Sequence, residues 1–205
     1  MHLTITEISF SEFRTRGSKF FGCLSPADSI TEMEELLIRL RSEHPSATHH
    51  CFAARVGPFS PEEISSDDGE PSGTAGLPIL NSLKSADLIN AILVVVRYYG
   101  GTKLGKSGLI EAYSTAAAEA IEAAKLRTLL LCKTFFVSYH YTEQSLIDKL
   151  AYDLELREID AEYTDTVSRR YAVAADRYPE AMARFEASAH LFASLREEGE
   201  SHLIL

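Results

Sequence analysis

Cysteine is scarce in this chain of 205 residues, with only Cys23, Cys51 and Cys132. The three are odd in number and widely spaced, with no CxxC pair, which favours a reduced, cytoplasmic protein. No apolar run approaches the ~20 residues that a membrane-spanning helix needs. The first residues lack the basic start and apolar block of a signal peptide. We therefore expect no contact with a membrane.

Basic residues are also outnumbered. The chain has 20 Lys and Arg against 30 Asp and Glu, which gives a net charge of −10. Such a surface repels bulk polyanions, so non-specific coating with nucleic acid is not expected. No signal specific for DNA appears either. Any anion-binding surface must be a small local patch, to be found residue by residue.

What the chain does have is an apolar pattern that falls into two runs, in a composition that is 45% hydrophobic. In the first run, alternation and β-branched stretches predict strands, and helical spacing predicts the segments between them. The predicted strands are 2–10, 18–24, 47–56 and 89–99. The predicted helices follow Asp28, follow a cap at Thr74, and span 107–125.

The second run starts after Leu126 and predicts the order β-α-β-β-α-β. Its strands are expected at 132–141, 156–163, 166–175 and 202–205, with helices between them. This order is that of a ferredoxin-like split βαβ unit. The fold class predicted for the chain is therefore α+β, in two domains that span residues 1–130 and 132–205.

Glycine gathers at one turn, between the apolar strand that ends near Arg97 and the Ala-rich helix. Glycines there let the backbone approach a ligand closely, and amides at the start of a helix attract anions. The spacing is neither GxxxxGK[ST] nor GxGxxG, so a tight packing turn is equally compatible with the pattern. The candidate anion-binding residues are Arg97, Gly100, Gly101, Lys103, Gly105, Lys106 and Ser107.

Carboxylates cluster in the polar segment 66–76. Asp67, Asp68 and Glu70 could hold Mg²⁺, pair with Arg97 and Lys103, or simply form a turn. The EF-hand spacing is absent, and we predict neither a metal nor a cofactor. Because neighbouring residues on a strand face opposite ways, His49 and His50 do not form a zinc site. The supporting polar residues that we select are His49, Asp68, Glu70 and Ser72.

The two stretches SDDGEPSGTAG, residues 66–76, and VVVRYYGGTKLGKSGL, residues 94–109, resemble signature segments of the YigZ/IMPACT family. Residues 18–20 and 47–53 add to the likeness, with Tyr99 and Ser107 as small departures. The resemblance implies a first domain like domain 2 of ribosomal protein S5. It also implies a second domain similar to the last ferredoxin-like domain of elongation factor G. It supplies no established reaction.

Three functions are compatible with these observations. The first is a non-catalytic binding protein of translation or its regulation, which contacts RNA or a ribosome-associated partner through the Gly-rich turn. The second is a regulator that binds a protein partner without RNA. The third is an enzyme that acts on a phosphorylated or other anionic small molecule. Because ribosome-associated proteins use both implied domain types, we rank the first function highest, on fold-level analogy.

Overall fold

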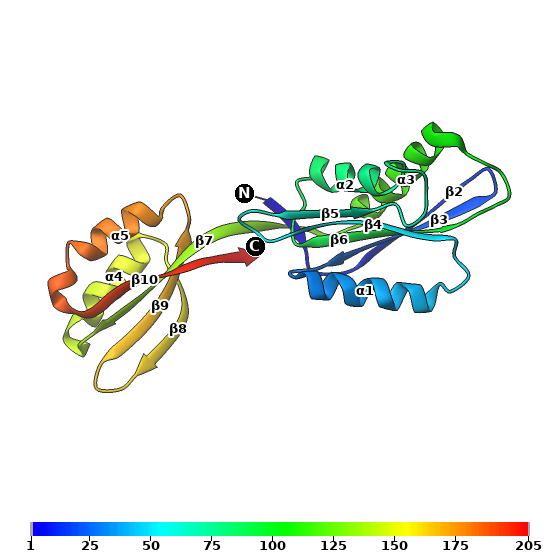
Figure 1. The fold of residues 1–205 in the computed structure, drawn as a ribbon. Coiled ribbons are helices and arrows are strands. Elements are labelled where there is room, and N and C mark those ends of the chain that lie inside the picture. The colour runs from blue at the N-terminus through cyan, green and yellow to red at the C-terminus, as the bar shows by residue number, and fades with distance from the viewer. Residues whose placement is uncertain (1, 205) are drawn as a thin grey trace. The chain divides into compact units, whose positions relative to one another are not determined.

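The computed structural model describes residues 2–204 and separates the chain into two compact units (Figure 1). The units span Met1–Leu129 and Leu130–Leu205. No helix in the described residues is both long and apolar enough to cross a membrane. The fold is mixed α+β, as the sequence pattern predicts.

The first unit is built on a five-stranded sheet in the order β2-β3-β6-β4-β5, in which every neighbouring pair is antiparallel. The strands of this unit are β1 His2–Ile5, β2 Ser9–Thr15, β3 Ser18–Pro26, β4 His49–Val56, β5 Glu62–Ser66 and β6 Ala91–Tyr98. The helices are α1 Ile30–Glu43, α2 Gly76–Ser85 and α3 Gly105–Glu122. Strand β1 lies outside this sheet and pairs with the start of β7, Leu126–Tyr139.

Helices cover both faces of the sheet, α1 on one and α2 with α3 on the other (Figure 1). The central strand β6 is therefore apolar on both sides. Val95 packs into the core beneath α2 and α3, while Val94 and Val96 pack beneath α1. This is the burial that an unbroken β-branched run predicts.

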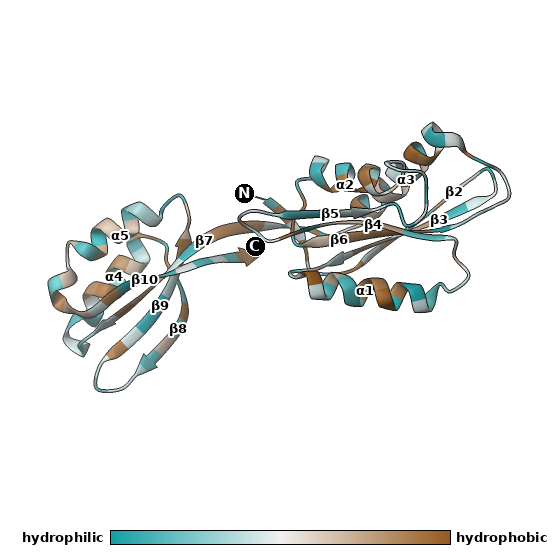
Figure 2. Ribbon diagram, viewed as in Figure 1, coloured by the Kyte–Doolittle hydropathy of each residue, from teal (hydrophilic) through white to brown (hydrophobic). Residues whose placement is uncertain are grey.

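Helix α1 is amphipathic, with hydrophobic and hydrophilic stretches that alternate along it in Figure 2. Its buried positions are Met33, Leu36, Leu37 and Leu40, at the spacing that places side chains on one face. Ser29 caps its start, because the serine hydroxyl accepts a hydrogen bond from the backbone N–H of Glu32 at 3.2 Å.

The second unit has the predicted order β-α-β-β-α-β. Its elements are β7, α4 Gln144–Asp153, β8 Arg157–Tyr163, β9 Val167–Ala174, α5 Tyr178–Glu186 and β10 Phe192–Ile204. Short 3-10 helices span Tyr141–Glu143 and Ala189–Leu191. Strand β7 pairs with both β9 and β10, and β8 forms the edge beside β9, as in a ferredoxin-like sheet. Its core packs Phe135 against Phe185 and Tyr171.

Several predicted boundaries are wrong, and each error has a local cause. The stretch 2–10 forms two strands rather than one, because the chain turns between Ile5 and Ser9. Strand β5 is missing from the predicted elements, because its short polar sequence EEISS carries no alternating apolar pattern. Strand β10 starts ten residues before the predicted position of 202 (192 against 202). Thr74 does not cap α2, since its hydroxyl donates to the carbonyl oxygen of Pro71.

Candidate functional site

The Gly-rich turn after β6 lies directly against the β2–β3 turn. A Cβ atom at Gly100 would lie 1.9 Å from the carbonyl carbon of Gly17, so only glycine fits there. Ser18 fixes this approach from the other side. Its hydroxyl accepts a hydrogen bond from the backbone N–H of Gly100 at 3.2 Å and another from Nη2 of Arg97 at 3.3 Å.

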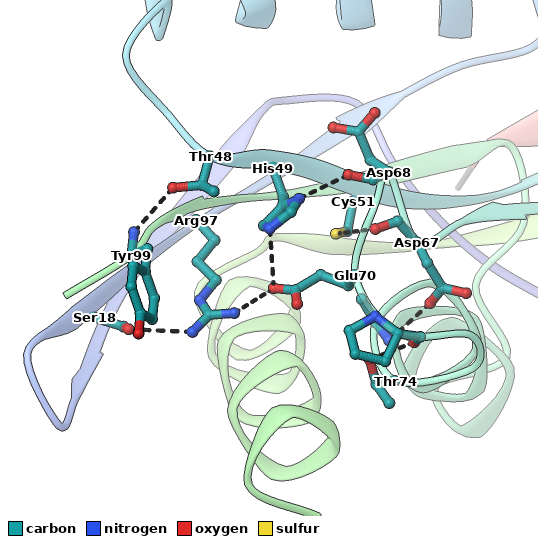
Figure 3. Close-up of polar contacts among 12 residues, drawn as sticks. Ser18, Thr48, His49, Cys51, Asp67, Asp68, Glu70, Thr74, Arg97 and Tyr99 are labelled. Atoms are coloured by element: carbon teal, nitrogen blue, oxygen red, sulfur yellow. Dashed lines mark hydrogen bonds and ion pairs between the residues drawn. The ribbon is translucent and has the colours of Figure 1, made fainter. Parts of the chain in front are cut away.

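Arg97 and Glu70 form a buried ion pair in the first unit (Figure 3). Nη1 of Arg97 donates to Oε1 of Glu70 at 2.5 Å, and the two side chains are only 5% and 4% exposed. The Arg97 guanidinium also lies 5.4 Å from the ring centroids of Phe20 and Tyr99. A charge held in this way is compensated inside the protein and is not presented to an external anion.

Tyr113 of α3 and Cys51 of β4 complete this buried network. The Tyr113 hydroxyl donates to Oε1 of Glu70 at 2.8 Å, and the Cys51 sulfur lies 3.3 Å from that hydroxyl. The thiol also donates to the carbonyl oxygen of Asp67 at 3.0 Å. Burial raises the pKa of both Cys51 and Tyr113, so both keep their protons at neutral pH. Cys51 is therefore a hydrogen-bonded core thiol rather than a ready nucleophile.

His49 borders the network, with a side chain that is 19% exposed. Its Nδ1 lies 2.8 Å from the carbonyl oxygen of Asp68. Because a carbonyl oxygen can only accept, Nδ1 carries the hydrogen. Nε2 then faces Oε1 of Glu70 at 3.8 Å, beyond hydrogen-bonding distance (Figure 3). The imidazole thus braces the 67–70 turn against β4.

Asp67 organises the start of α2. Its carboxylate accepts hydrogen bonds from the backbone N–H groups of Gly73, Ala75 and Gly76, at 2.8, 2.9 and 2.9 Å. Burial alone would raise the pKa of Asp67, but these N–H donors outweigh burial and hold the pKa below its ordinary value. Asp67 thus accepts from the first residue of α2 and from its N-cap, although it precedes the helix by nine positions (67 to 76).

Asp68 belongs to a different set of contacts. Its carboxylate accepts from the backbone N–H of His50 at 2.6 Å and pairs with Arg41 of α1 at 3.2 Å. Among residues 2–204, Lys103 forms no ion pair with Asp68 or Glu70. Of the carboxylates considered as partners for Arg97, only Glu70 contacts it.

The rest of the Gly-rich turn is exposed. Lys103, Lys106 and Ser107 are all exposed, as are Gly101 and Gly105. Gly101 and Gly105 have φ angles of +85° and +71°, a left-handed conformation that suits glycine. Helix α3 starts at Gly105, and its first N–H groups have no intrahelical partner, as in any helix. No cap side chain accepts a hydrogen bond from them. Ser72, also exposed, has no side-chain hydrogen bond to another residue within 2–204.

Metal ligands do not gather anywhere in the part of the chain that the structure describes. No group of three or more His, Cys, Asp or Glu residues has the arrangement of a metal site. The three carboxylates of the 67–70 turn point to different partners. They bind backbone N–H groups, Arg41 and Arg97, respectively.

The sequence-based selection missed two residues that hold the site together. Tyr113, in the helix predicted over 107–125, is not among the candidate site residues, yet its hydroxyl donates to Glu70. A tyrosine amid alanines is a usable signal, because a buried hydroxyl needs a partner. Asp67 was noted only as one of three carboxylates. Its capping role depends on a contact that no helix-start pattern encodes.

Comparisons with known proteins identify relatives of this chain. The sequence pattern of the Impact N-terminal domain matches residues 16–121. The chain is 35% identical to the IMPACT family member YvyE of Bacillus subtilis, over 77% of this chain and 70% of that protein. It is 32% identical to the IMPACT family member YigZ of Escherichia coli, over 82% and 83% of the two chains.

Solved structures extend the likeness to the full length. A crystal structure described as that of a hypothetical protein aligns over 97% of this chain and 96% of its own, with 30% identity and a TM-score of 0.64. The structure of the two-domain translational regulator Yih1 aligns over 57% of this chain and 47% of its own, with 26% identity and a TM-score of 0.41. This second likeness is too partial to bear on function. The match to the Impact N-terminal domain, by contrast, covers both the buried network and the Gly-rich turn. The chain therefore belongs to the IMPACT family.

Proposed function

We propose that this chain is a non-catalytic binding protein of translation or its regulation. It contacts RNA or a ribosome-associated partner through the exposed turn Gly100–Ser107. The observation that carries the proposal is the pair Lys103 and Lys106, both exposed and without an ion pair in residues 2–204. They flank the uncapped start of α3, whose free N–H groups add positive potential.

Arg97 supports the contact indirectly. Because its guanidinium is buried against Glu70, Arg97 shapes the turn and leaves the charge at the surface to the two lysines. Ser18 links it to Gly100, so the ion pair and the turn are parts of one assembly.

The space beside the turn favours a surface contact over catalysis on a small molecule. The cavity next to the first turns of α3, lined by Leu104, Gly108 and Arg16 among others, has a volume of about 240 Å³. Pockets that bind small molecules usually have volumes of ~300–1,000 Å³. An open turn with two unpaired lysines suits a phosphate backbone better, because backbone contacts need charge and exposure rather than enclosure.

A salt titration of RNA binding tests the proposal. We expect a fluorescent single-stranded RNA to bind weakly, with log K falling by about 0.7 per phosphate contact for each unit of log salt concentration. Two contacts predict a slope of about −1.4 on that rule. The double variant Lys103→Glu with Lys106→Glu should lose the binding.

The control is the double variant Lys125→Glu with Lys149→Glu, which changes the net charge by the same amount at residues that do not belong to the turn. It should bind as the wild type does. A wild-type chain that binds no RNA at low salt overturns the RNA contact. Equal loss in both double variants would assign the binding to net charge alone.

A further inference from the structure

A groove of about 680 Å³ lies between α2 and α3, on the outer side of the first unit. Leu77 and Ile110 stand at its edges with 50% and 44% of their surface exposed. Small side chains line its middle, including those of Ser82, Ser114 and Ala118. The groove thus has exposed apolar side chains at its edges. The small residues in its middle leave room for an apolar side chain of a partner.

The two helices run in the same direction. The chain leaves α2 at Asp87, whose carbonyl oxygen accepts from the backbone N–H of Leu3 in β1 at 3.0 Å. It leaves α3 toward Leu126, which pairs with Ile5 of the same strand. Because both helices end at β1, their dipoles add, with the positive end near the Gly-rich turn and the negative end near β1.

One row of α3 side chains along the groove has the same order of charge as the helix dipole, positive at its start and negative at its end. Residues four apart in a helix are neighbours on its surface. Ile110, Ser114, Ala118 and Glu122 all line the groove, and Lys106 precedes Ile110 by one turn. Lys106 and Glu122 are exposed, and neither forms an ion pair within residues 2–204. The row therefore has an unpaired cation at one end and an unpaired anion at the other.

We propose that this groove binds a second copy of the chain, in a twofold dimer whose α3 helices run in opposite directions and cross at Ser114. The crossing angle is about 50°, at which rows of residues four apart in the two helices align. A twofold interface places residue i against residue j and j against i. About Ser114, the partner of Lys106 is Glu122 and the partner of Ile110 is Ala118, because each pair lies symmetrically four or eight residues away. A cation meets an anion, and a large apolar side chain meets a small one, twice in each dimer.

Self-complementarity favours a second copy over an unrelated partner. The same face supplies both members of each pair, and antiparallel packing sets the positive end of each helix pair against the negative end of the other. The net charge of −10 on each copy opposes association. Near-physiological salt, with a Debye length of about 8 Å, screens that repulsion while leaving close contacts in place. Association is therefore best measured under those conditions.

The first test measures the mass of the full-length chain by sedimentation over a wide concentration range. We expect a monomer–dimer equilibrium in the wild type, weakened at least about tenfold by Ile110→Arg, since a buried charge at an interface is costly. Ile38→Arg is the matched control. Ile38 lies on α1, outside the groove, is 67% exposed, and should leave association unchanged. Circular dichroism confirms that both variants are folded.

The second test reverses the charges. Lys106→Glu alone and Glu122→Lys alone should each weaken the dimer, and the double variant should restore it, because it rebuilds both pairs with opposite polarity. A wild type that is monomeric at every concentration overturns the proposal, as does a dimer that Ile110→Arg leaves intact. So does a double variant no stronger than the single ones. Lys106 takes part in both proposals, whereas Lys103 lies outside the groove. Loss of RNA binding in Lys103→Glu with an unchanged dimer therefore separates this inference from the proposed function.

Discussion

Glu70 is the residue on which the buried network depends. Its Oε1 atom accepts hydrogen bonds from both Arg97 and Tyr113. Glu70 itself lies in a turn rather than in a strand of the sheet. A buried ion pair adds little stability when compared with a well-packed apolar pair. Removing one partner alone, however, leaves an uncompensated buried charge. The network therefore links the 67–70 turn to β6 and α3. A single substitution at Glu70 should disturb the position of this turn.

We expect Glu70→Gln to lower the free energy of unfolding by about 3 kcal/mol, because it strands the Arg97 guanidinium without a countercharge. Urea unfolding at neutral pH, followed by circular dichroism, measures the loss. The exposed carboxylate Glu12, which pairs with Lys19, gives the control Glu12→Gln, which should keep the wild-type midpoint. A double variant with Arg97→Met should cost less than the sum of the single ones. Strict additivity would mean that the ion pair is not the cause.

At the scale of elements, the start of α2 shows how a loop can define a helix. Asp67 supplies acceptors to the N–H groups of Ala75 and Gly76 at that start, a role that an N-cap residue usually fills. The pKa of Asp67 in the folded chain lies below its ordinary value of 3.8. A carboxyl group with a lowered folded-state pKa contributes stability above its unfolded pKa. That contribution is lost as the pH falls through the folded pKa.

We therefore expect Asp67→Asn to cost about 1 kcal/mol at neutral pH, the usual cost of losing a helix cap. Below about pH 4 the free energy of unfolding of the wild type should fall more steeply than that of the variant, because only the wild type has this carboxylate to protonate. Urea unfolding at a series of pH values measures both the cost at neutral pH and the pH dependence of the free energy of unfolding. Glu34→Gln, on the exposed side of α1, should follow the wild-type curve. Parallel curves for Asp67→Asn and the wild type would contradict the capping role.

Elements with a strong apolar period were predictable from the sequence. Helix α1 shows this, because its buried residues recur at helical spacing, and strand β6 was predictable as an unbroken apolar run. Strand β5 was not predictable, since the residues EEISS carry no alternating apolar pattern and the strand forms only by pairing with β4. Strand β10 was predicted only at its end, from residue 202, because the charged stretch REEGES at its centre carries no alternating apolar pattern. In both cases tertiary pairing outweighs local propensity.

The candidate site was predictable only in part. A buried arginine at the end of an apolar strand implies a partner, and the carboxylates of 66–76 were predicted to pair with Arg97 and Lys103. Which one pairs depends on how the loop turns. At Asp68 the backbone has a positive φ of +42°, and this carboxylate reaches Arg41 instead. Such a choice depends on the three-dimensional path of the loop, which the spacing of residues does not encode.

At the scale of the whole molecule, the division between the two compact units falls inside a strand rather than in a loop. Strand β7 starts at Leu126, six residues before the position predicted for it, Cys132 (126 against 132). Its residues 126–129 pair with β1, and its residues 132–139 pair with β9. Because the backbone is hydrogen-bonded on both sides of the division, a protease has no exposed linker there to cut. Truncation is the better test of whether each unit folds alone.

We propose that residues 1–130 fold without the rest of the chain, since the core beneath α2 and α3 draws only on this segment. The fragment 1–130 should unfold cooperatively in urea. The fragment 1–125 should be less stable by about 2 kcal/mol or more, because it loses the partner strand of β1 and the fully buried Leu129. If 1–130 shows no cooperative transition, the first unit depends on the second. If both fragments are equally stable, the pairing of β1 with β7 contributes nothing to the first unit, and the division belongs before Leu126.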